Sequence, residues 1–178
     1  MKTKSNKDLT VYLSKDKINA RIKEIARQLS NEFSKDYPII IGVLNGSFIF
    51  LADLVRLFDF DCEIDFVKVN SYIGKESSGK VKLDQDLSID INNKRVILVE
   101  DIIDSGLTIE FLYEHILSFK PKDITIVTLL SKKNNYNLNF NIDFIGFEIG
   151  SKFVVGYGLD LNHKHRNLDS LYGLKDKI

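Results

Sequence analysis

Hydrophobic residues recur with helical spacing in three parts of the chain. The first part follows Ser14, a residue type that often caps a helix, and its apolar positions form one face: Ile18, Ile22, Ile25, Ala26, Leu29 and Phe33. Residues 48–58 are strongly apolar and predict a second helix. A third is predicted after residue 108, where Ile109, Leu112 and Ile116 lie at helical spacing.

Short apolar runs between these helices predict strands. They cover residues 39–44, 63–69, 81–83, 96–99, 123–130, 144–147 and 153–157. Strands that alternate with helices predict an α/β fold, in which a twisted, mostly parallel sheet carries helices on both faces. The 178 residues contain no repeat or linker, so we expect one domain, 1–178.

Composition narrows the functional classes. The 25 basic and 25 acidic residues give a net charge of zero, which argues against a nucleic-acid partner. No apolar run approaches the roughly 18 residues of a membrane span, and the first eight residues carry no signal-peptide core. Cys62 is the single cysteine, so no internal disulfide is possible and we expect a cytoplasmic protein.

Residues 95–109 carry the most informative chemistry. The apolar run 96–99 is predicted to stop at two adjacent carboxylates, Glu100 and Asp101, and a turn and a helix follow. In open α/β sheets, ligands bind where strands end in this way. The turn contains these residues: Asp104, Ser105, Gly106, Leu107 and Thr108.

This turn has the properties of a phosphate site. Gly106 permits a positive φ and a close approach of the backbone, and the amides at the start of the next helix can donate to an anion. The carboxylates would repel phosphate, so they need sugar hydroxyls or a divalent metal ion. A ligand with phosphate, ribose and magnesium meets all these requirements. A solvated turn in which Asp104 or Ser105 caps the helix is the plainer alternative.

Residues 95–109 resemble the phosphoribosyl-pyrophosphate (PRPP) motif of the type I phosphoribosyltransferases. The motif has one variable position, and the aspartate found there, Asp104, resembles the residue of the 6-oxopurine branch, the hypoxanthine-guanine phosphoribosyltransferases. The resemblance implies that Glu100 and Asp101 hold the ribose hydroxyls and Mg²⁺, and that Asp104 accepts a hydrogen bond or proton from purine N7. It assigns the 5′-phosphate to residues 104–108 and adds to the fold a small hood built from terminal segments.

A second match lies near the C-terminus. Residues 152–160 resemble the purine-binding strand of the same family. By this resemblance Phe153 stacks on the base, Val154 meets the base edge through its backbone, and Asp160 lies at the purine site and helps to hold Mg²⁺. Arg166 is similar to the arginine that binds pyrophosphate. A core strand followed by a surface arginine is the plainer interpretation.

The turn Leu44-Asn45-Gly46 follows a predicted strand. In the family the corresponding turn contacts pyrophosphate, often through a cis peptide, which here would be Leu44–Asn45. Many relatives have lysine or arginine where Asn45 stands, so one positive charge is missing from this chain. A simple strand-to-helix turn is the alternative.

Two further segments complete the resemblance. Lys132 aligns with the lysine that donates to the purine 6-oxo group, although this chain has Ser-Lys-Lys where bacterial relatives have Asp-Lys-Pro, which makes Lys133 a rival. Ser71 and Tyr72 begin a loop, about 71–81, that is predicted to be mobile and to close over the reaction centre.

The resemblance implies Mg²⁺-dependent transfer of a phosphoribosyl group from PRPP to hypoxanthine or guanine, giving IMP or GMP and pyrophosphate. It also implies a homodimer or homotetramer. A xanthine-preferring enzyme is an alternative, because residue types do not rank the three 6-oxopurines. An alternative of a different class is a PRPP- or nucleotide-sensing regulator that binds nucleic acid.

Overall fold

The computed structural model describes residues 9–71 and 81–174. Its central sheet has six strands in the order β4-β3-β2-β5-β6-β7. They are β2 (Ile39–Leu44), β3 (Glu63–Ser71), β4 (Val81–Gln85), β5 (Arg95–Ile103), β6 (Asp123–Ser131) and β7 (Phe144–Glu148). Only the β3–β4 pair is antiparallel, so the mostly parallel sheet predicted from the sequence is confirmed.

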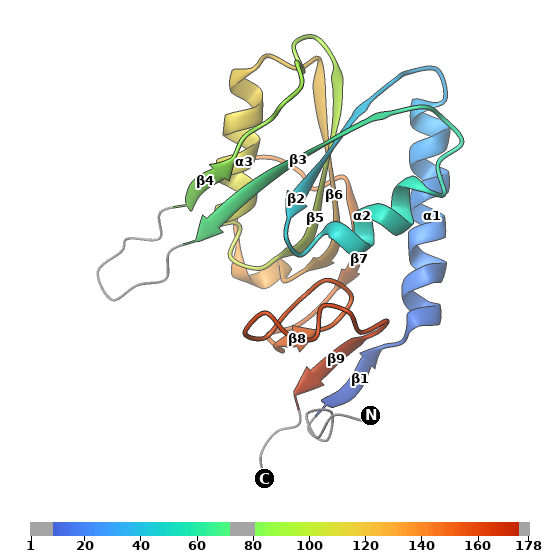
Figure 1. The fold of residues 1–178 in the computed structure, drawn as a ribbon, viewed down its shortest axis with the longest axis vertical. Coiled ribbons are helices and arrows are strands. Elements are labelled where there is room, and N and C mark those ends of the chain that lie inside the picture. The colour runs from blue at the N-terminus through green and yellow to red at the C-terminus, as the bar shows by residue number, and fades with distance from the viewer. Residues whose placement is uncertain (1–8, 72–80, 175–178) are drawn as a thin grey trace.

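Helices cover both faces of this sheet (Figure 1). Helices α1 (Lys15–Phe33) and α2 (Phe48–Val55) pack on one face, and α3 (Leu107–Ser118) packs on the other. A hydrophobic core lies on each face of the sheet, and successive strand residues pack into opposite cores. Ile40 packs in the core with α1, whereas Ile41 packs in the core with α3. Burial on both faces explains why the central strands β2, β5 and β6 are largely apolar.

The second helix is shorter than predicted. It ends at Val55, not at residue 58, because its last turn tightens into bonds between residues three apart. Leu57 N donates to Leu54 O at 3.1 Å, and Phe58 N donates to Val55 O at 3.3 Å. Ser14 caps α1 as predicted, since its side chain accepts from Lys17 N.

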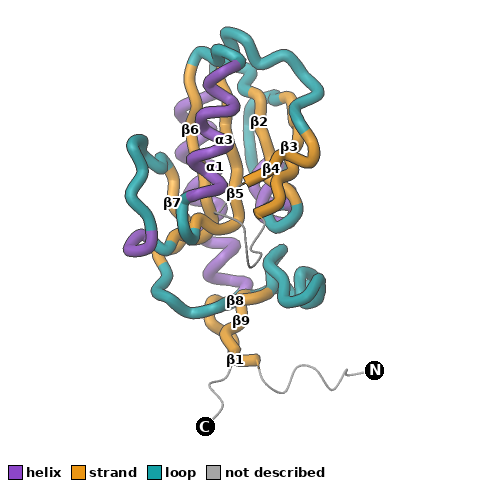
Figure 2. Tube along the Cα trace, turned by 90° about the vertical axis from the view of Figure 1, so that its left-hand side faces the viewer, coloured by secondary structure: helices purple, strands orange, loops and turns teal. Residues whose placement is uncertain are grey.

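A separate three-stranded sheet of order β1-β9-β8 lies beside the carboxyl ends of the main strands (Figures 1 and 2). It joins β1 (Leu9–Leu13), β8 (Val154–Val155) and β9 (Leu171–Leu174) in antiparallel pairs. This is the hood that the resemblance implied, although the apolar pattern predicted neither β1 nor β9. The strand predicted at 153–157 covers only Val154–Val155, because Gly156 and Tyr157 have positive φ angles.

Strand β5 does not stop at the acidic pair. It continues to Ile103, which pairs with Ser131 of β6, so Glu100 and Asp101 belong to the strand. The prediction that the strand ends at Val99 was therefore wrong. Among the described residues, no helix is both long and apolar enough to span a membrane.

Candidate active site

The two acids of β5 are buried. Glu100 and Asp101 have relative exposures of 7% and 9%, and Glu100 Oε2 has no hydrogen-bond partner within the described residues. Burial raises the pKa of Glu100 well above its ordinary value, and the neighbouring charge of Asp101 raises it further. Burial also raises the pKa of Asp101, although the positive charge of Arg166 opposes this. A bound cation would favour the ionised form of both groups.

Three segments meet closely beside Asp101. A methyl group added at Gly46 would lie 1.6 Å from Asp101 Oδ2, so the carboxylate rests directly on the glycine. A methyl group added at Gly158 would lie 2.0 Å from the carbonyl oxygen of Gly46. The turn after β2, the strand β5 and the loop after β8 are thus in contact. The Leu44–Asn45 peptide is cis, as the resemblance implied.

The loop between β5 and α3 leads into a helix N-terminus. Gly106 is the N-cap of α3 with a φ of 81°, and no side chain among the described residues caps the helix there. Ser105 and Leu107 are exposed, and Thr108 is half-buried. The first amides of α3 and two hydroxyls are therefore available to an anion, which is the arrangement predicted for the 5′-phosphate.

Asp104 lies at the start of this loop and is held by Lys132. Lys132 is buried, with 9% relative exposure, and its Nζ lies 2.6 Å from Asp104 Oδ2. Burial tends to raise the pKa of Asp104, but hydrogen bonds from Lys132 and Asn135 and the lysine charge lower it overall. Lys133 is exposed and lies 3.5 Å from Glu148. Lys132, and not its rival, therefore lies beside Asp104.

A hollow of about 190 Å³ brings most of the predicted base-binding residues together. Its lining consists of Asp101, Ile102, Asp104, Lys132, Phe153, Val154, Leu159 and Asp160. Phe153 is 49% exposed, so a large part of its ring is free for a ligand. Arg166 does not line the hollow but lies 2.6 Å from Asp160 Oδ1 and donates to Gly158 O at 2.7 Å.

The structure does not test every predicted residue. Ser71 ends β3, but its side chain is not described, and Tyr72 lies outside the described residues, as does nearly all of the loop 71–81. Within residues 9–71 and 81–174, no three His, Cys, Asp or Glu side chains are grouped closely enough to hold a metal ion by themselves.

Sequence reasoning missed Asn135. This residue belongs to the short 3₁₀ helix η2 (Lys133–Asn135), and its Nδ2 donates to Asp104 Oδ1 at 2.9 Å. The only signal was the asparagine-rich run 134–141, which has little preference for helix or strand. That composition does not reveal a contact to a residue 31 positions earlier.

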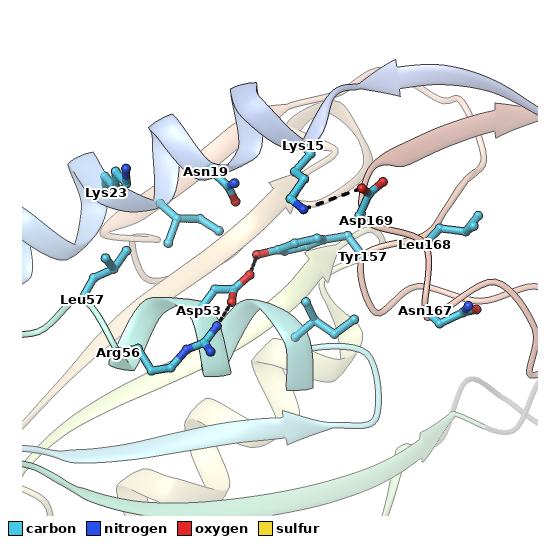
Figure 3. A pocket seen from close by; sticks show the side chains of 12 residues that line it. Lys15, Asn19, Lys23, Asp53, Arg56, Leu57, Tyr157, Asn167, Leu168 and Asp169 are labelled. Carbon is cyan, nitrogen blue, oxygen red and sulfur yellow. Dashed lines mark hydrogen bonds and ion pairs between the residues drawn. The ribbon is translucent and has the colours of Figure 1, made fainter.

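A larger cavity of about 560 Å³ lies between α1, α2 and residues 157–169 (Figure 3). Tyr157 OH donates to Asp53 Oδ2 at 2.5 Å, and Asp53 also pairs with Arg56. At the other end Lys15 Nζ lies 3.8 Å from Asp169. No predicted site residue lines this cavity, so the smaller hollow at the sheet edge is the better candidate.

Comparisons with known proteins identify the family of the chain. Residues 10–162 match the phosphoribosyl transferase domain family. The chain is 43% identical to a hypoxanthine-guanine phosphoribosyltransferase of Aquifex aeolicus, over 99% of this chain and 100% of that protein.

Two solved structures are also similar. A hypoxanthine-guanine phosphoribosyltransferase of Bacillus anthracis superposes with a TM-score of 0.87 at 40% identity, over 93% of this chain and 98% of the other. The hypoxanthine phosphoribosyltransferase of Trypanosoma cruzi, solved with the product IMP, gives a TM-score of 0.88 at 30% identity, over 99% and 100%.

Proposed function

The chain belongs to the phosphoribosyltransferase family, among its hypoxanthine-guanine members, and we propose that it catalyses the reaction of that group. It transfers the 5-phosphoribosyl group of PRPP to hypoxanthine or guanine, giving IMP or GMP and pyrophosphate in purine salvage. One observation carries the proposal. A lysine, an aspartate and a half-exposed aromatic ring line one hollow, directly beside the buried acids and the loop 104–108.

PRPP occupies the sheet edge. Its 5′-phosphate accepts hydrogen bonds from the loop 104–108 and the first amides of α3. Glu100 and Asp101 face the ribose hydroxyls. The pyrophosphate lies against the turn 44–46 and within reach of Arg166, whose planar fork of donors suits phosphate oxygens. The close packing of Gly46, Asp101 and Gly158 supports this placement, because it brings the three segments to one point.

The base occupies the hollow. Phe153 stacks on the ring, and the backbone of Val154 meets its edge. Lys132 donates to the 6-oxo oxygen and repels the amino group of adenine, which gives preference for 6-oxopurines. When Lys132 turns to the base, Asp104 Oδ2 loses that partner and can accept from N7. Electron density then shifts towards N9, which becomes the better nucleophile.

Magnesium fits this site together with the substrate. Glu100 and Asp101 supply buried carboxylates with raised pKa, and one Glu100 oxygen lacks a partner within the described residues. Mg²⁺ commonly takes one or two protein carboxylates and completes its shell with phosphate oxygens and water. Asp160 is the further candidate ligand near pyrophosphate. The ion would neutralise charge on the leaving group.

We extend the proposal to the remaining properties of the protein. We assign the carboxylates and the lysine of the hollow to substrate and metal contacts, not to a covalent intermediate, so positioning and electrostatics provide the catalysis. The loop 71–81 closes over the site and excludes water from the ribosyl cation.

The protein is one domain, 1–178, which works as a homodimer or homotetramer in the cytoplasm without nucleic-acid or membrane partners.

A nucleotide-forming assay tests the function. The protein is incubated with PRPP, Mg²⁺ and, separately, hypoxanthine, guanine, xanthine or adenine, and the products are separated. We expect IMP and GMP without AMP. Xanthosine monophosphate as the main product would favour the xanthine-preferring alternative. No nucleotide from any base, with PRPP binding intact, would reject the enzyme and favour the regulator.

A further inference from the structure

We propose that Asn135 is a positioning residue that holds the Asp104 carboxylate towards the base, an inference that rests on the proposed function. Both oxygens of Asp104 are engaged in the structure. Lys132 Nζ lies 2.6 Å from Oδ2, and Asn135 Nδ2 lies 2.9 Å from Oδ1. Asn135 does not line the hollow, so it acts through Asp104 and not on the substrate.

The two partners of Asp104 have different fates in the reaction. Lys132 is the donor for the purine carbonyl, so its hydrogen bond to Asp104 weakens when the base binds. The Asn135 bond is then the side-chain contact, among the described residues, that still fixes the carboxylate. A carboxylate free to rotate would spend less time with its lone pair aimed at N7, and small misplacements of a catalytic group reduce the rate strongly.

The turn that carries Asn135 is anchored to the site on two sides. Its backbone starts from Lys132, whose amide donates to Ile103 O at 2.9 Å, and Asn135 N donates to Lys132 O at 2.8 Å. The next residue, Tyr136, shares a 2.5 Å hydrogen bond with Ser131 of β6. The Cβ of Tyr136 also lies 2.8 Å from the position of a methyl group added at Gly106. The asparagine is therefore placed before substrate arrives.

An amide suits this position because it donates without adding charge. The charged groups that share the hollow with Asp104 are Lys132, Asp101 and Asp160. A lysine at 135 would place a second cation beside Asp104 in competition with Lys132, and a carboxylate at 135 would repel Asp104. The amide nitrogen must face the carboxylate, because its oxygen at that distance would repel the same group.

Two substitutions separate this role from a structural one. Asn135→Ala removes the donor, whereas Asn135→Asp keeps the shape of the side chain but replaces the donor with a charge. Asn134→Ala is the matched control, because Asn134 lies in the same exposed turn and makes no side-chain hydrogen bond among the described residues. The readouts are kcat, KM for PRPP and the melting temperature of each variant.

We expect Asn135→Ala to lower kcat about tenfold, the value of one hydrogen bond to a charged group, with KM for PRPP and the melting temperature unchanged. Asn135→Asp is expected to lower kcat further, and Asn134→Ala to match the wild type. An Asn135→Asp variant with the kcat of the wild type would overturn the inference. An Asn135→Ala variant that changes only KM for PRPP or only the melting temperature would overturn it as well. A wild-type protein that forms no nucleotide would instead reject the proposed function itself.

Discussion

Two regions of the molecule form the candidate site. The first is the carboxyl ends of the regular parallel strands β5 and β6, and the second is the C-terminal segment 156–166, which has almost no regular secondary structure. The strands stay in register up to the pair of Ile103 and Ser131. Positive φ angles occur in the other segment at Gly156, Tyr157, Gly158, Asn162, His163 and His165. Non-glycine residues adopt that conformation at a cost of about 1–2 kcal/mol each.

The two regions keep their shape by different contacts. The strand ends are fixed by two hydrophobic cores and a continuous ladder of hydrogen bonds. The C-terminal segment depends on individual backbone contacts: Tyr157 N donates to Leu168 O at 2.8 Å, and Gly158 N donates to Arg166 O at 2.9 Å. We therefore expect substitutions at the strand ends to change chemistry, and substitutions in the segment to change its conformation first.

The largest effect is expected at the strand end, for Asp104→Asn. This change keeps the shape of the side chain but removes the charge that attracts the N7 proton, so kcat should fall by about a hundredfold or more. PRPP should bind almost as before, because in the proposed function backbone amides bind its 5′-phosphate. Steady-state kinetics and titration calorimetry measure the two quantities.

The control for this substitution is Asp86→Asn, which alters a surface aspartate paired with His115. It should leave kcat unchanged. Full activity in Asp104→Asn would contradict the role of Asp104 at N7, and so would an equal loss of kcat and of PRPP affinity.

In the C-terminal segment, Gly158→Ala should have the largest effect. The new methyl group would lie 2.0 Å from Gly46 O at a residue whose φ is 100°. We expect the free energy of unfolding to fall by about 3 kcal/mol and activity to be lost with it. Gly150→Ala is the control, because no described atom lies within 4 Å of its added methyl group. Equal denaturation midpoints for the two variants would show that the contact is unimportant.

Ionisation of the buried Glu100 at the strand end should lower the free energy of unfolding. Because its pKa is raised in the folded protein, the contribution of Glu100 to wild-type stability falls as pH rises above the ordinary pKa of 4.5. Without Mg²⁺, Glu100→Gln should therefore be more stable than wild type by about 1–2 kcal/mol at pH 8, and no more stable at pH 4.

Urea unfolding at the two pH values measures this difference. The exposed Glu114 of α3 provides the control, since Glu114→Gln should match the wild type at both pH values. A stability gain of Glu100→Gln that is the same at pH 4 and pH 8 would mean that ionisation of Glu100 is not its cause.

The smallest effect is expected for Tyr157→Phe. Tyr157 is 3% exposed, and its hydroxyl bonds to Asp53 on α2 (Figure 3). Asp53 keeps its partner Arg56 in the variant, so the unfolding free energy should fall by only about 0.5–1 kcal/mol. Tyr113→Phe is a control on α3, where the ring stacks on Phe140. A loss above that of a single hydrogen bond would show that the hydroxyl anchors the whole segment.

The regular part of the fold could be predicted from the sequence because it follows hydrophobic spacing. Strands buried on both faces and the α1 face are examples. The short strand β1 was not predicted because its burial alternates weakly. The extension of β5 was not predicted because two adjacent carboxylates resemble the end of a strand. Turns with positive φ at Tyr157 or His165 have no periodic signal, so only resemblance to a family identified that segment as functional.

The site was predicted to a similar extent. The residues around the hollow came from motif matches, and the structure places them together. The choice between Lys132 and Lys133 needed three-dimensional information, because adjacent residues differ only in the direction of their side chains. Asn135 needed it as well, since its contact with Asp104 joins two loops that no local pattern connects.

In the proposed function, the sheet edge and the C-terminal segment together form one nucleotide site. Amide hydrogen exchange with and without IMP tests whether both regions bind the nucleotide. We predict that IMP slows exchange in both residues 100–108 and residues 153–160, while α1 and α2 around the larger cavity are unaffected. Protection at α1 and α2 instead, or at only one of the two regions, would show that the two regions do not form one nucleotide site.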